Sequence, residues 1–174
     1  MSAESIQVEV TRDARDYRSA IWLNYWHGGG WLWMVAMGLI GAVVSCLLAE
    51  PWESPVVEAA ITAGLVLGAM FIAHAITILL TAAGAMKLPG AREPVRYAFS
   101  EESLGVSSNV GHGTTNWVNW RKAFENRRVI VVRHRVNLMH ILPKRQLSAK
   151  QQEQIRALLR RVLAGRVAFM EQRT

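Results

Sequence analysis

The chain has 174 residues, which suits one ordinary domain or a small domain joined to a membrane segment. Its formal net charge of +7 is unevenly distributed: residues 1–28 carry −1, residues 50–58 carry −3 and residues 87–174, with 17 basic and 6 acidic residues, carry +11. The single cysteine, Cys46, excludes an intramolecular disulfide bond.

The first segment, residues 1–28, predicts a cytoplasmic strand followed by an amphipathic helix. Apolar and polar residues alternate over residues 6–10, which is typical of a strand. Thr11 is expected to cap a helix over residues 12–27, in which apolar residues recur at three- and four-residue spacing. Two positions fit this helix: the inner membrane surface, or the surface of the C-terminal domain.

Two long apolar stretches without charged residues follow. Both exceed the roughly 18 apolar residues expected of a spanning helix. We therefore predict a two-helix transmembrane hairpin over residues 29–86, with spans at about 30–49 and 59–85 and a loop at 50–58. The loop has no Lys or Arg, whereas basic residues flank the hairpin on its other side, so both termini are expected in the cytoplasm and the loop outside.

Small residues predict a packing seam between the two spans. The first span contains Gly38 and Gly41, and the second contains Gly64 and Gly68 in a GxxxG pattern. Small residues let helix backbones approach closely within a membrane. Folding the hairpin about its loop brings the two pairs opposite each other in one chain, and a homo-oligomer through the Gly64/Gly68 face is the alternative.

From residue 92 onward the long apolar stretches give way to short segments in which apolar and polar residues alternate, which predicts strands. An amphipathic helix closes the segment, because Ser148 and Gln151 fit a capping box and the apolar residues that follow share one helical face. Five or six antiparallel strands closed by one helix predict a small α+β domain over residues 87–174, a pleckstrin-homology-like half-barrel. The expected strands lie at residues 95–99, 104–107, 114–117, 120–124, 129–132 and 138–142.

The order and spacing of several short motifs resemble the bacterial YcxB-like protein family. The motifs are residues 8–11 with Asp16-Tyr17, residues 97–106 (YAFSEESLGV), 120–123 (WRKA) and 141–145 (ILPKR). The resemblance covers residues 6–163 and implies the same architecture of strand, helix, two adjacent spans and C-terminal domain. It also implies a multi-pass protein of the bacterial inner membrane, and it brings no catalytic residues to this chain.

Reactive residues are not arranged as in an enzyme. The five histidines are scattered without the spacing of a metal site, and the chain has no Walker-type or GxGxxG phosphate loop. His112 lies near Ser107, but a polar turn explains this grouping better than a catalytic pair. His74, within the second span, is expected to be a neutral, hydrogen-bonded side chain. We therefore expect no catalytic residue, metal or cofactor.

The basic C-terminal domain gives the strongest indication of function. Anionic lipid attracts each cation near the membrane surface by ~1 kcal/mol. We expect this domain to bind anionic lipid headgroups or a protein partner, and not nucleic acid. Four basic residues between strands, with two tryptophans that belong either to this surface or to the core, form the candidate site: Arg121, Lys122, Lys144, Arg145, Trp117 and Trp120.

Together these features predict a non-enzymatic, membrane-anchored adaptor or regulatory protein. The alternative is a membrane-resident immunity protein that neutralises a bacterial toxin at the inner membrane, a role that suits small two-span proteins.

Overall fold

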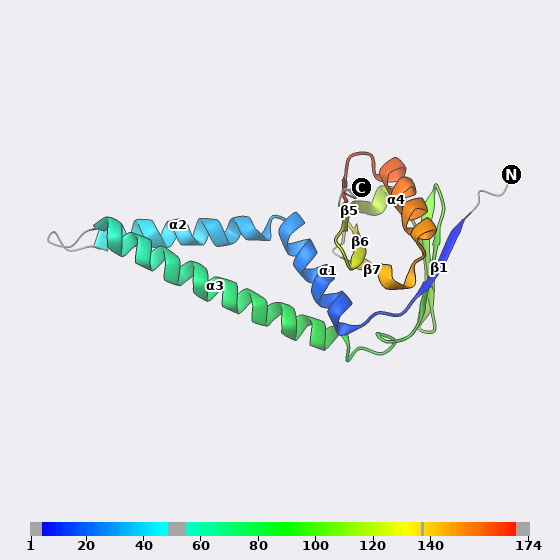
Figure 1. Ribbon diagram of the computed structural model, residues 1–174, viewed down its shortest axis with the longest axis horizontal. Coiled ribbons are helices and arrows are strands. Elements are labelled where there is room, and N and C mark those ends of the chain that lie inside the picture. Colours follow the sequence, from blue (N-terminus) through cyan, green and yellow to red (C-terminus); the bar gives the residue numbers. More distant parts are fainter. Residues whose placement is uncertain (1–4, 49–54, 137, 170–174) are drawn as a thin grey trace. The chain divides into compact units, whose positions relative to one another are not determined.

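The computed structural model describes residues 5–48, 55–136 and 138–169 (Figure 1). Over these residues the chain forms an α+β fold with four helices and two four-stranded sheets. It divides into two compact units: residues 25–81 form one, and residues 1–24 together with 82–174 form the other. The apolar hairpin sequence is therefore inserted between two parts of the same unit.

The first sheet joins the N-terminal strand to the C-terminal part of the chain. Its order is β1-β2-β3-β4, all antiparallel, and Val8 of β1 lies opposite Tyr97 of β2. The strand predicted at residues 6–10 is confirmed. Because it pairs with β2, it belongs to the same sheet as the strands that follow the hairpin. The bounds are β1 Ile6–Val10, β2 Val95–Phe99, β3 Ser103–Ser108 and β4 Gly111–Asn116.

The second sheet has the order β7-β6-β5-β8, and only the β5–β8 pair is parallel. The strand β8 was not among the expected elements. It has only two residues, too few to show the alternation of apolar and polar residues that predicts a strand. The capping box predicted for the last helix is present, since Ser148 and Gln151 bond reciprocally at the start of α4, Ala149–Leu163. The strand bounds are β5 Trp120–Glu125, β6 Val129–His134, β7 Met139–Pro143 and β8 Val167–Ala168.

The main core lies between the two sheets and α4. The apolar face of α4, including Ile155 and Leu159, is buried in one cluster with residues from both sheets. Trp117 and Trp120 are members of this cluster, and their indole N–H groups donate to backbone carbonyls at 2.9 and 3.3 Å. Each tryptophan therefore has both its apolar ring and its polar group satisfied inside the core.

A second, smaller core lies on the opposite face of the second sheet. Helix α1, Ala14–His27, buries Ala20 and Leu23 against Phe124, Val131 and other residues of β5, β6 and β7. Of the two positions expected for this helix, the structure shows packing against the C-terminal domain. The second sheet is thus covered on both faces, whereas the first sheet has one face open.

The cap of α1 differs from the expectation. Asp13, and not Thr11, accepts a bond from the backbone N–H of Asp16 at 2.8 Å, and Asp16 accepts one in return from the N–H of Asp13 at 2.9 Å. The helix therefore begins at Ala14. Thr11 instead exchanges two backbone hydrogen bonds with the side chain of Gln146. The Asp-x-x-Asp spacing is the signal that the Thr11 prediction overlooked.

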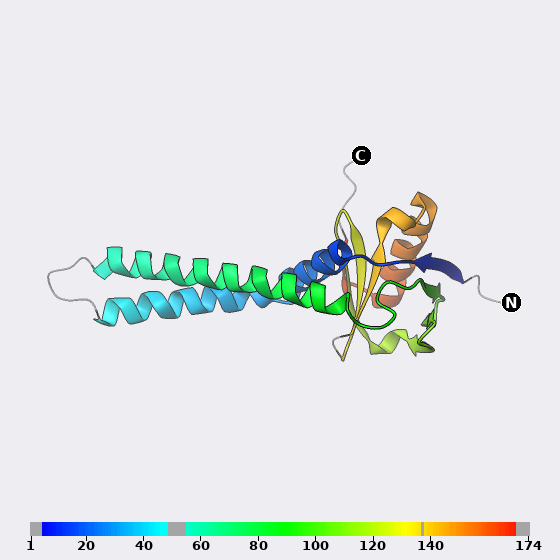
Figure 2. The ribbon, with the colours of Figure 1, turned by 90° about the horizontal axis from the view of Figure 1, so that it is seen from below.

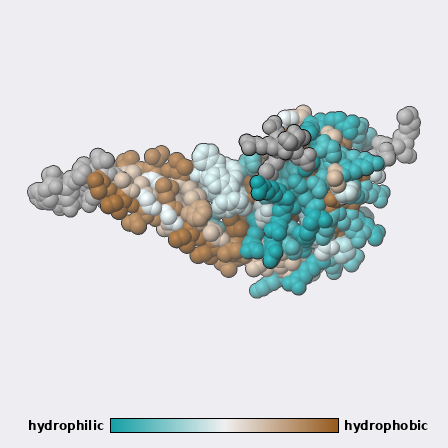
Figure 3. Space-filling model, in the orientation of Figure 1, coloured by the Kyte–Doolittle hydropathy of each residue, from teal (hydrophilic) through white to brown (hydrophobic). Residues whose placement is uncertain are grey.

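The second unit contains α2, Gly30–Leu48, and α3, Pro55–Ala85. The predicted loop at 50–58 falls partly on residues outside the described ranges, and α3 begins four residues earlier than the predicted span. Pro55 is its first residue, where a missing N–H costs no helical bond. Figure 3 shows hydrophobic residues gathered over these helices.

Helix α3 contains a stretch, Ala60–Ala85, that is long and apolar enough to cross a membrane. Only 6% of an 18-residue segment of this stretch is buried within the structure, whereas the core helix of a soluble protein is mostly buried. Among the described residues, α2 is long and apolar enough to cross a membrane only when it is joined with α1 as one bent span.

The seam between α2 and α3 (Figure 2) is built from different residues than expected. On α2, a Cβ at Gly38 would lie 2.7 Å from Leu67 of α3, and one at Gly41 would lie 3.3 Å from Val66. On α3, however, nothing lies within 4 Å of a Cβ at Gly64 or Gly68. The expected meeting of four glycines is therefore wrong. The α2 glycines accommodate branched side chains of α3, and the α3 glycines face away from this contact.

Candidate functional site

The structure does not bring the six predicted site residues together as one exposed surface. Arg121 and Lys122 are exposed on β5. Trp117 and Trp120 are 5% and 1% exposed, so of the two alternatives, binding surface or core, the structure shows the core. These tryptophans are buried because they lie just before and at the start of β5, on the side of the second sheet that packs against α4 and the first sheet.

Lys144 is bound to a buried carboxylate. Its Nζ lies 2.5 Å from Oε1 of Glu125, whose side chain is fully buried, and 3.1 Å from the carbonyl oxygen of Asn126. Arg156 donates to the same carboxylate from Nη2 at 2.6 Å and from Nε at 2.9 Å. Burial alone would raise the pKa of Glu125, but the hydrogen bonds from Arg156 and Lys144 outweigh burial and lower it. Lys144 therefore compensates an internal charge.

Arg145 is also bound within the unit. Its Nη1 donates to Oδ1 of Asp16 at 2.5 Å, its Nη2 lies 3.4 Å from Oδ2 of Asp13, and it also reaches the carbonyl oxygen of Thr11 at 3.3 Å. Asp16 is completely buried. Together with Gln146, Arg145 fastens the start of α1 to the turn after β7. Lys144 and Arg145 are candidate binding residues in the sequence, which does not predict these ion pairs.

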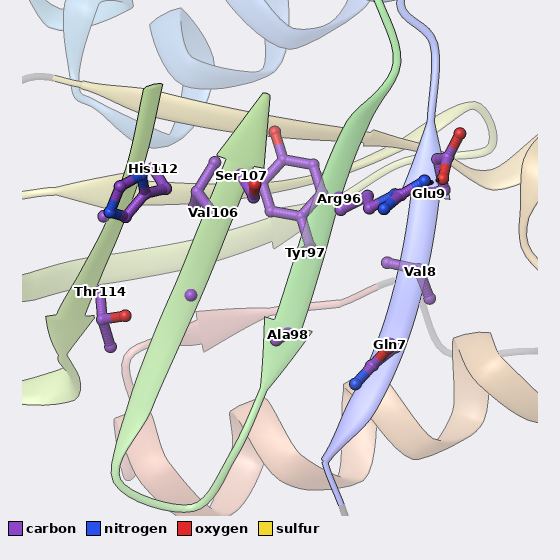
Figure 4. A pocket seen from close by; sticks show the side chains of 12 residues that line it. Gln7, Val8, Glu9, Arg96, Tyr97, Ala98, Val106, Ser107, His112 and Thr114 are labelled. Carbon is purple, nitrogen blue, oxygen red and sulfur yellow. Dashed lines mark hydrogen bonds and ion pairs between the residues drawn. The ribbon is translucent and has the colours of Figure 1, made fainter. Parts of the chain in front are cut away.

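The open face of the first sheet carries a shallow groove with a volume of about 480 Å³ (Figure 4). The strand register places two rows of side chains across it: Glu9, Arg96, Ser107 and His112 in one, and Gln7, Ala98, Gly105 and Thr114 in the other. The groove is hollow at Ala98 and Gly105 because these residues have small side chains or none. A Cβ at Gly105 would already lie 3.4 Å from that of Ala98, so a larger residue would fill the groove.

The groove contains several polar side chains but has no arrangement typical of catalysis. Arg96 is paired with Glu9 at 2.7 Å in an exposed salt bridge. Ser107 and His112 are register partners on β3 and β4. Among the described residues, no third group orients His112 toward the serine, as nucleophilic catalysis requires.

A cluster of titratable and aromatic groups lies inside the unit beside the main core. His140 packs between Tyr97 and Trp120, with ring centroids 5.6 and 5.2 Å away. Burial, with smaller contributions from the charges of Arg12 and His134, lowers the pKa of His140 to about 4. Burial likewise raises the pKa of Tyr97 to about 12, and its buried hydroxyl has no hydrogen-bond partner among the described residues.

The comparisons with known proteins concern this same unit. The model of the YcxB-like protein family matches residues 99–159, from the last residue of β2 to within α4. The match includes two motifs that carry the resemblance, residues 120–123 and 141–145. Neither a curated protein nor a solved structure matches the chain. The family match confirms the resemblance that the sequence shows and identifies residues 99–159 as a YcxB-like segment.

Proposed function

We propose that the chain is a membrane-anchored adaptor or regulatory protein of the bacterial inner membrane. It crosses the membrane twice through α2 and α3, with both termini in the cytoplasm. Its basic, pleckstrin-homology-like unit binds anionic lipid headgroups or a protein partner, and it does so without catalysing a reaction.

The observation that carries the proposal is the division of charge between the two units. All twenty Lys and Arg residues lie in residues 1–24 and 82–174, which with ten acidic residues have a net charge of +10. Residues 25–81 have no Lys or Arg and three acidic residues. A basic unit joined in sequence to an apolar hairpin without positive charge is what the positive-inside rule favours for a cytoplasmic domain.

The surface of the hairpin supports a position within lipid. Large apolar side chains are exposed along both helices, among them Leu39, Leu47, Leu65 and Leu80 at 64–79%. Soluble monomers rarely expose contiguous apolar surface on this scale. The arrangement of the other unit supports a half-barrel, because two sheets of mainly consecutive antiparallel strands enclose a core that a C-terminal helix covers.

The topology is tested with single cysteines in the full-length chain. Cys46→Ala removes the natural thiol, and Ser5→Cys, Gln154→Cys and Glu53→Cys then report on the two termini and the loop. In intact spheroplasts, a membrane-impermeant maleimide should label only Glu53→Cys, and the other two should react after permeabilisation. Labelling of Ser5→Cys in intact spheroplasts would contradict the proposed orientation.

The lipid interaction is tested by hydrogen exchange of the full-length chain in nanodiscs. Nanodiscs of phosphatidylcholine are compared with nanodiscs that also contain phosphatidylglycerol. We expect slower exchange in the basic unit with the anionic lipid, and loss of this protection at high salt, because salt screens exposed charges. Identical exchange rates in both kinds of nanodisc would contradict the proposed lipid binding. The proposal would then depend on finding a protein partner that copurifies stoichiometrically from native membranes.

A further inference from the structure

We propose that the cavity beside the β5–β6 turn binds a phosphate group, carried by a lipid headgroup or by a free phosphorylated molecule. The cavity is a wide depression open to solvent, with a volume of about 950 Å³. It is lined from α1, the turn, the segment after β7 and α4 by Ser19, Asn126, Arg127, Arg128, Lys144, Arg145 and Gln152. Four of these residues are cationic and none is acidic. The inference rests on the proposed function only where a lipid supplies the phosphate.

The turn that carries the two central arginines is held in a fixed conformation. The side-chain oxygen of Asn126 accepts from the backbone N–H groups of Arg128 and Val129, both at 2.9 Å. The amide nitrogen of Asn126 donates to Oγ of Ser19 at 2.8 Å, and the carbonyl of Arg128 accepts from the N–H of Lys144 at 2.9 Å. The backbone is therefore tied to α1 on one side and to the segment after β7 on the other, which lowers the entropic cost of binding.

Two of the four cations that line the cavity are already paired with acidic residues. Lys144 and Arg156 bind Glu125, and Arg145 binds Asp16. Arg127 and Arg128, by contrast, are exposed, and within the described ranges neither side chain has an ion pair. Two guanidinium groups next to each other on a fixed turn thus lack a counter-charge.

The chemistry of these groups favours a phosphate over a carboxylate. A guanidinium presents parallel N–H donors that match two oxygens of a phosphate. A phosphate monoester carries a charge of about −1.5 to −2 and three acceptor oxygens, enough for both arginines at once. The Nζ of Lys144 also lies at the cavity wall, but its charge is compensated by Glu125, so Arg127 and Arg128 supply the uncompensated positive charge.

The chain provides a matched control at the other end of β5. Arg121 and Lys122 lie at the beginning of this strand and Arg127 and Arg128 just beyond its end, about 17 Å away for five residues of extended chain. The variants Arg127→Glu/Arg128→Glu and Arg121→Glu/Lys122→Glu change the net charge equally. If binding depends only on general attraction to anions, both double variants should weaken it equally. If it depends on a site at the turn, only Arg127→Glu/Arg128→Glu should weaken it.

The experiment measures binding to the full-length chain in a mild neutral detergent by titration calorimetry. The probes are inorganic phosphate, dihexanoyl phosphatidic acid and, as a neutral lipid, dihexanoyl phosphatidylcholine. We expect phosphatidic acid to bind and phosphatidylcholine not to bind. Arg127→Glu/Arg128→Glu should weaken binding about tenfold or more, because two charge-assisted bonds are lost, and Arg121→Glu/Lys122→Glu should leave it within about twofold.

The outcomes separate this site from the broader function. Binding of inorganic phosphate as tightly as phosphatidic acid supports a free phosphorylated molecule, and binding of the lipid alone supports a headgroup. Equal loss in both double variants would overturn the site while leaving general attraction to anionic lipid intact. No binding of either phosphate probe would also overturn it, independently of the nanodisc result. Arg127→Lys/Arg128→Lys keeps the charge and should lose affinity only partly, and the melting of the glutamate variant by circular dichroism checks that its own loss of binding does not come from misfolding.

Discussion

Arg145 and Asp16 are 129 residues apart in the sequence, yet Nη1 of the arginine lies 2.5 Å from Oδ1 of the aspartate. The aspartate is completely buried, and the arginine is 42% exposed. One bond thus joins the start of α1, before the apolar hairpin, to the segment that follows β7. Arg145 lies within residues 99–159, which match the YcxB-like family model, so this contact gives part of the matched segment a structural role in this chain.

Replacing Arg145 should destabilise the basic unit. Arg145→Ala leaves the buried carboxylate of Asp16 with only the backbone N–H of Asp13, so we expect a loss of about 1–3 kcal/mol in the free energy of unfolding. The loss is below that of a fully buried pair because water reaches the guanidinium. Denaturant unfolding of the full-length chain in detergent measures it.

The same experiment contains its own controls. Asp16→Asn combined with Arg145→Ala should cost less than the sum of the two single changes, because the two side chains interact directly. Arg161→Ala removes an exposed pair with Glu101, where the two side chains are 66% and 65% exposed, and should have little effect. Equal losses from Arg145→Ala and Arg161→Ala would show that the buried contact is not formed.

His140 should make the unit less stable in mild acid. Its pKa is lowered from 6.5 to about 4 in the folded chain, so between these pH values the unfolded chain binds a proton that the folded chain does not. The stabilising contribution is complete above pH 6.5 and is lost as the pH falls toward 4. Because His140 is only partly buried by accessible surface, we expect a change of about 1–3 kcal/mol.

Thermal unfolding at a series of pH values measures the contribution of His140. His140→Phe keeps the ring contacts with Tyr97 and Trp120 and should flatten the decline between pH 6.5 and 4. His112→Phe changes a histidine on the exposed strand β4 and should leave the decline unchanged. A decline that persists unaltered in His140→Phe would assign it to other groups.

Local patterns in the sequence predicted most of the elements. The alternation of residues 6–10 and 95–99 and the apolar face of residues 155–163 each depend only on neighbouring residues, and all three elements formed as expected. The capping box at Ser148 is equally local. The pairing of β1 with β2 was not predicted, because no local signal shows that a strand before the hairpin joins a sheet after it.

The candidate site was predicted less well for the same reason. A lysine or arginine in a polar segment is predicted to be an exposed charge. Only the fold shows that Lys144 and Arg145 form ion pairs with Glu125 and Asp16. Trp120 likewise reads as a surface or a core residue until the position of α4 is known. Arg121 and Lys122 are exposed as expected, and they lie where the pairing of β5 with β6 has a register irregularity.

The pairing of β1 with β2 predicts how the basic unit must be isolated. Val8 and Val10 are buried in its core, and burying each such side chain is worth about 1.5–3 kcal/mol. A fragment of residues 82–174 should therefore lack a cooperative melting transition. Residues 1–24 joined to it through a flexible Gly/Ser linker should restore one, as measured by circular dichroism. A fragment that melts cooperatively without β1 would contradict this prediction.

The glycines of the hairpin should respond in opposite ways to alanine. Gly38→Ala places a Cβ 2.7 Å from Cδ2 and 2.8 Å from Cγ of Leu67, so the helices must separate or the leucine must change rotamer, at a cost of about 1–3 kcal/mol. Gly64→Ala adds a methyl group to open space, and the better helix propensity of alanine should stabilise α3 by up to about 1 kcal/mol. Reversible unfolding in mixed micelles compares the two. A loss of stability in Gly64→Ala would indicate that a second copy of the chain covers the Gly64/Gly68 face, because nothing in the described part of one chain lies close enough to clash.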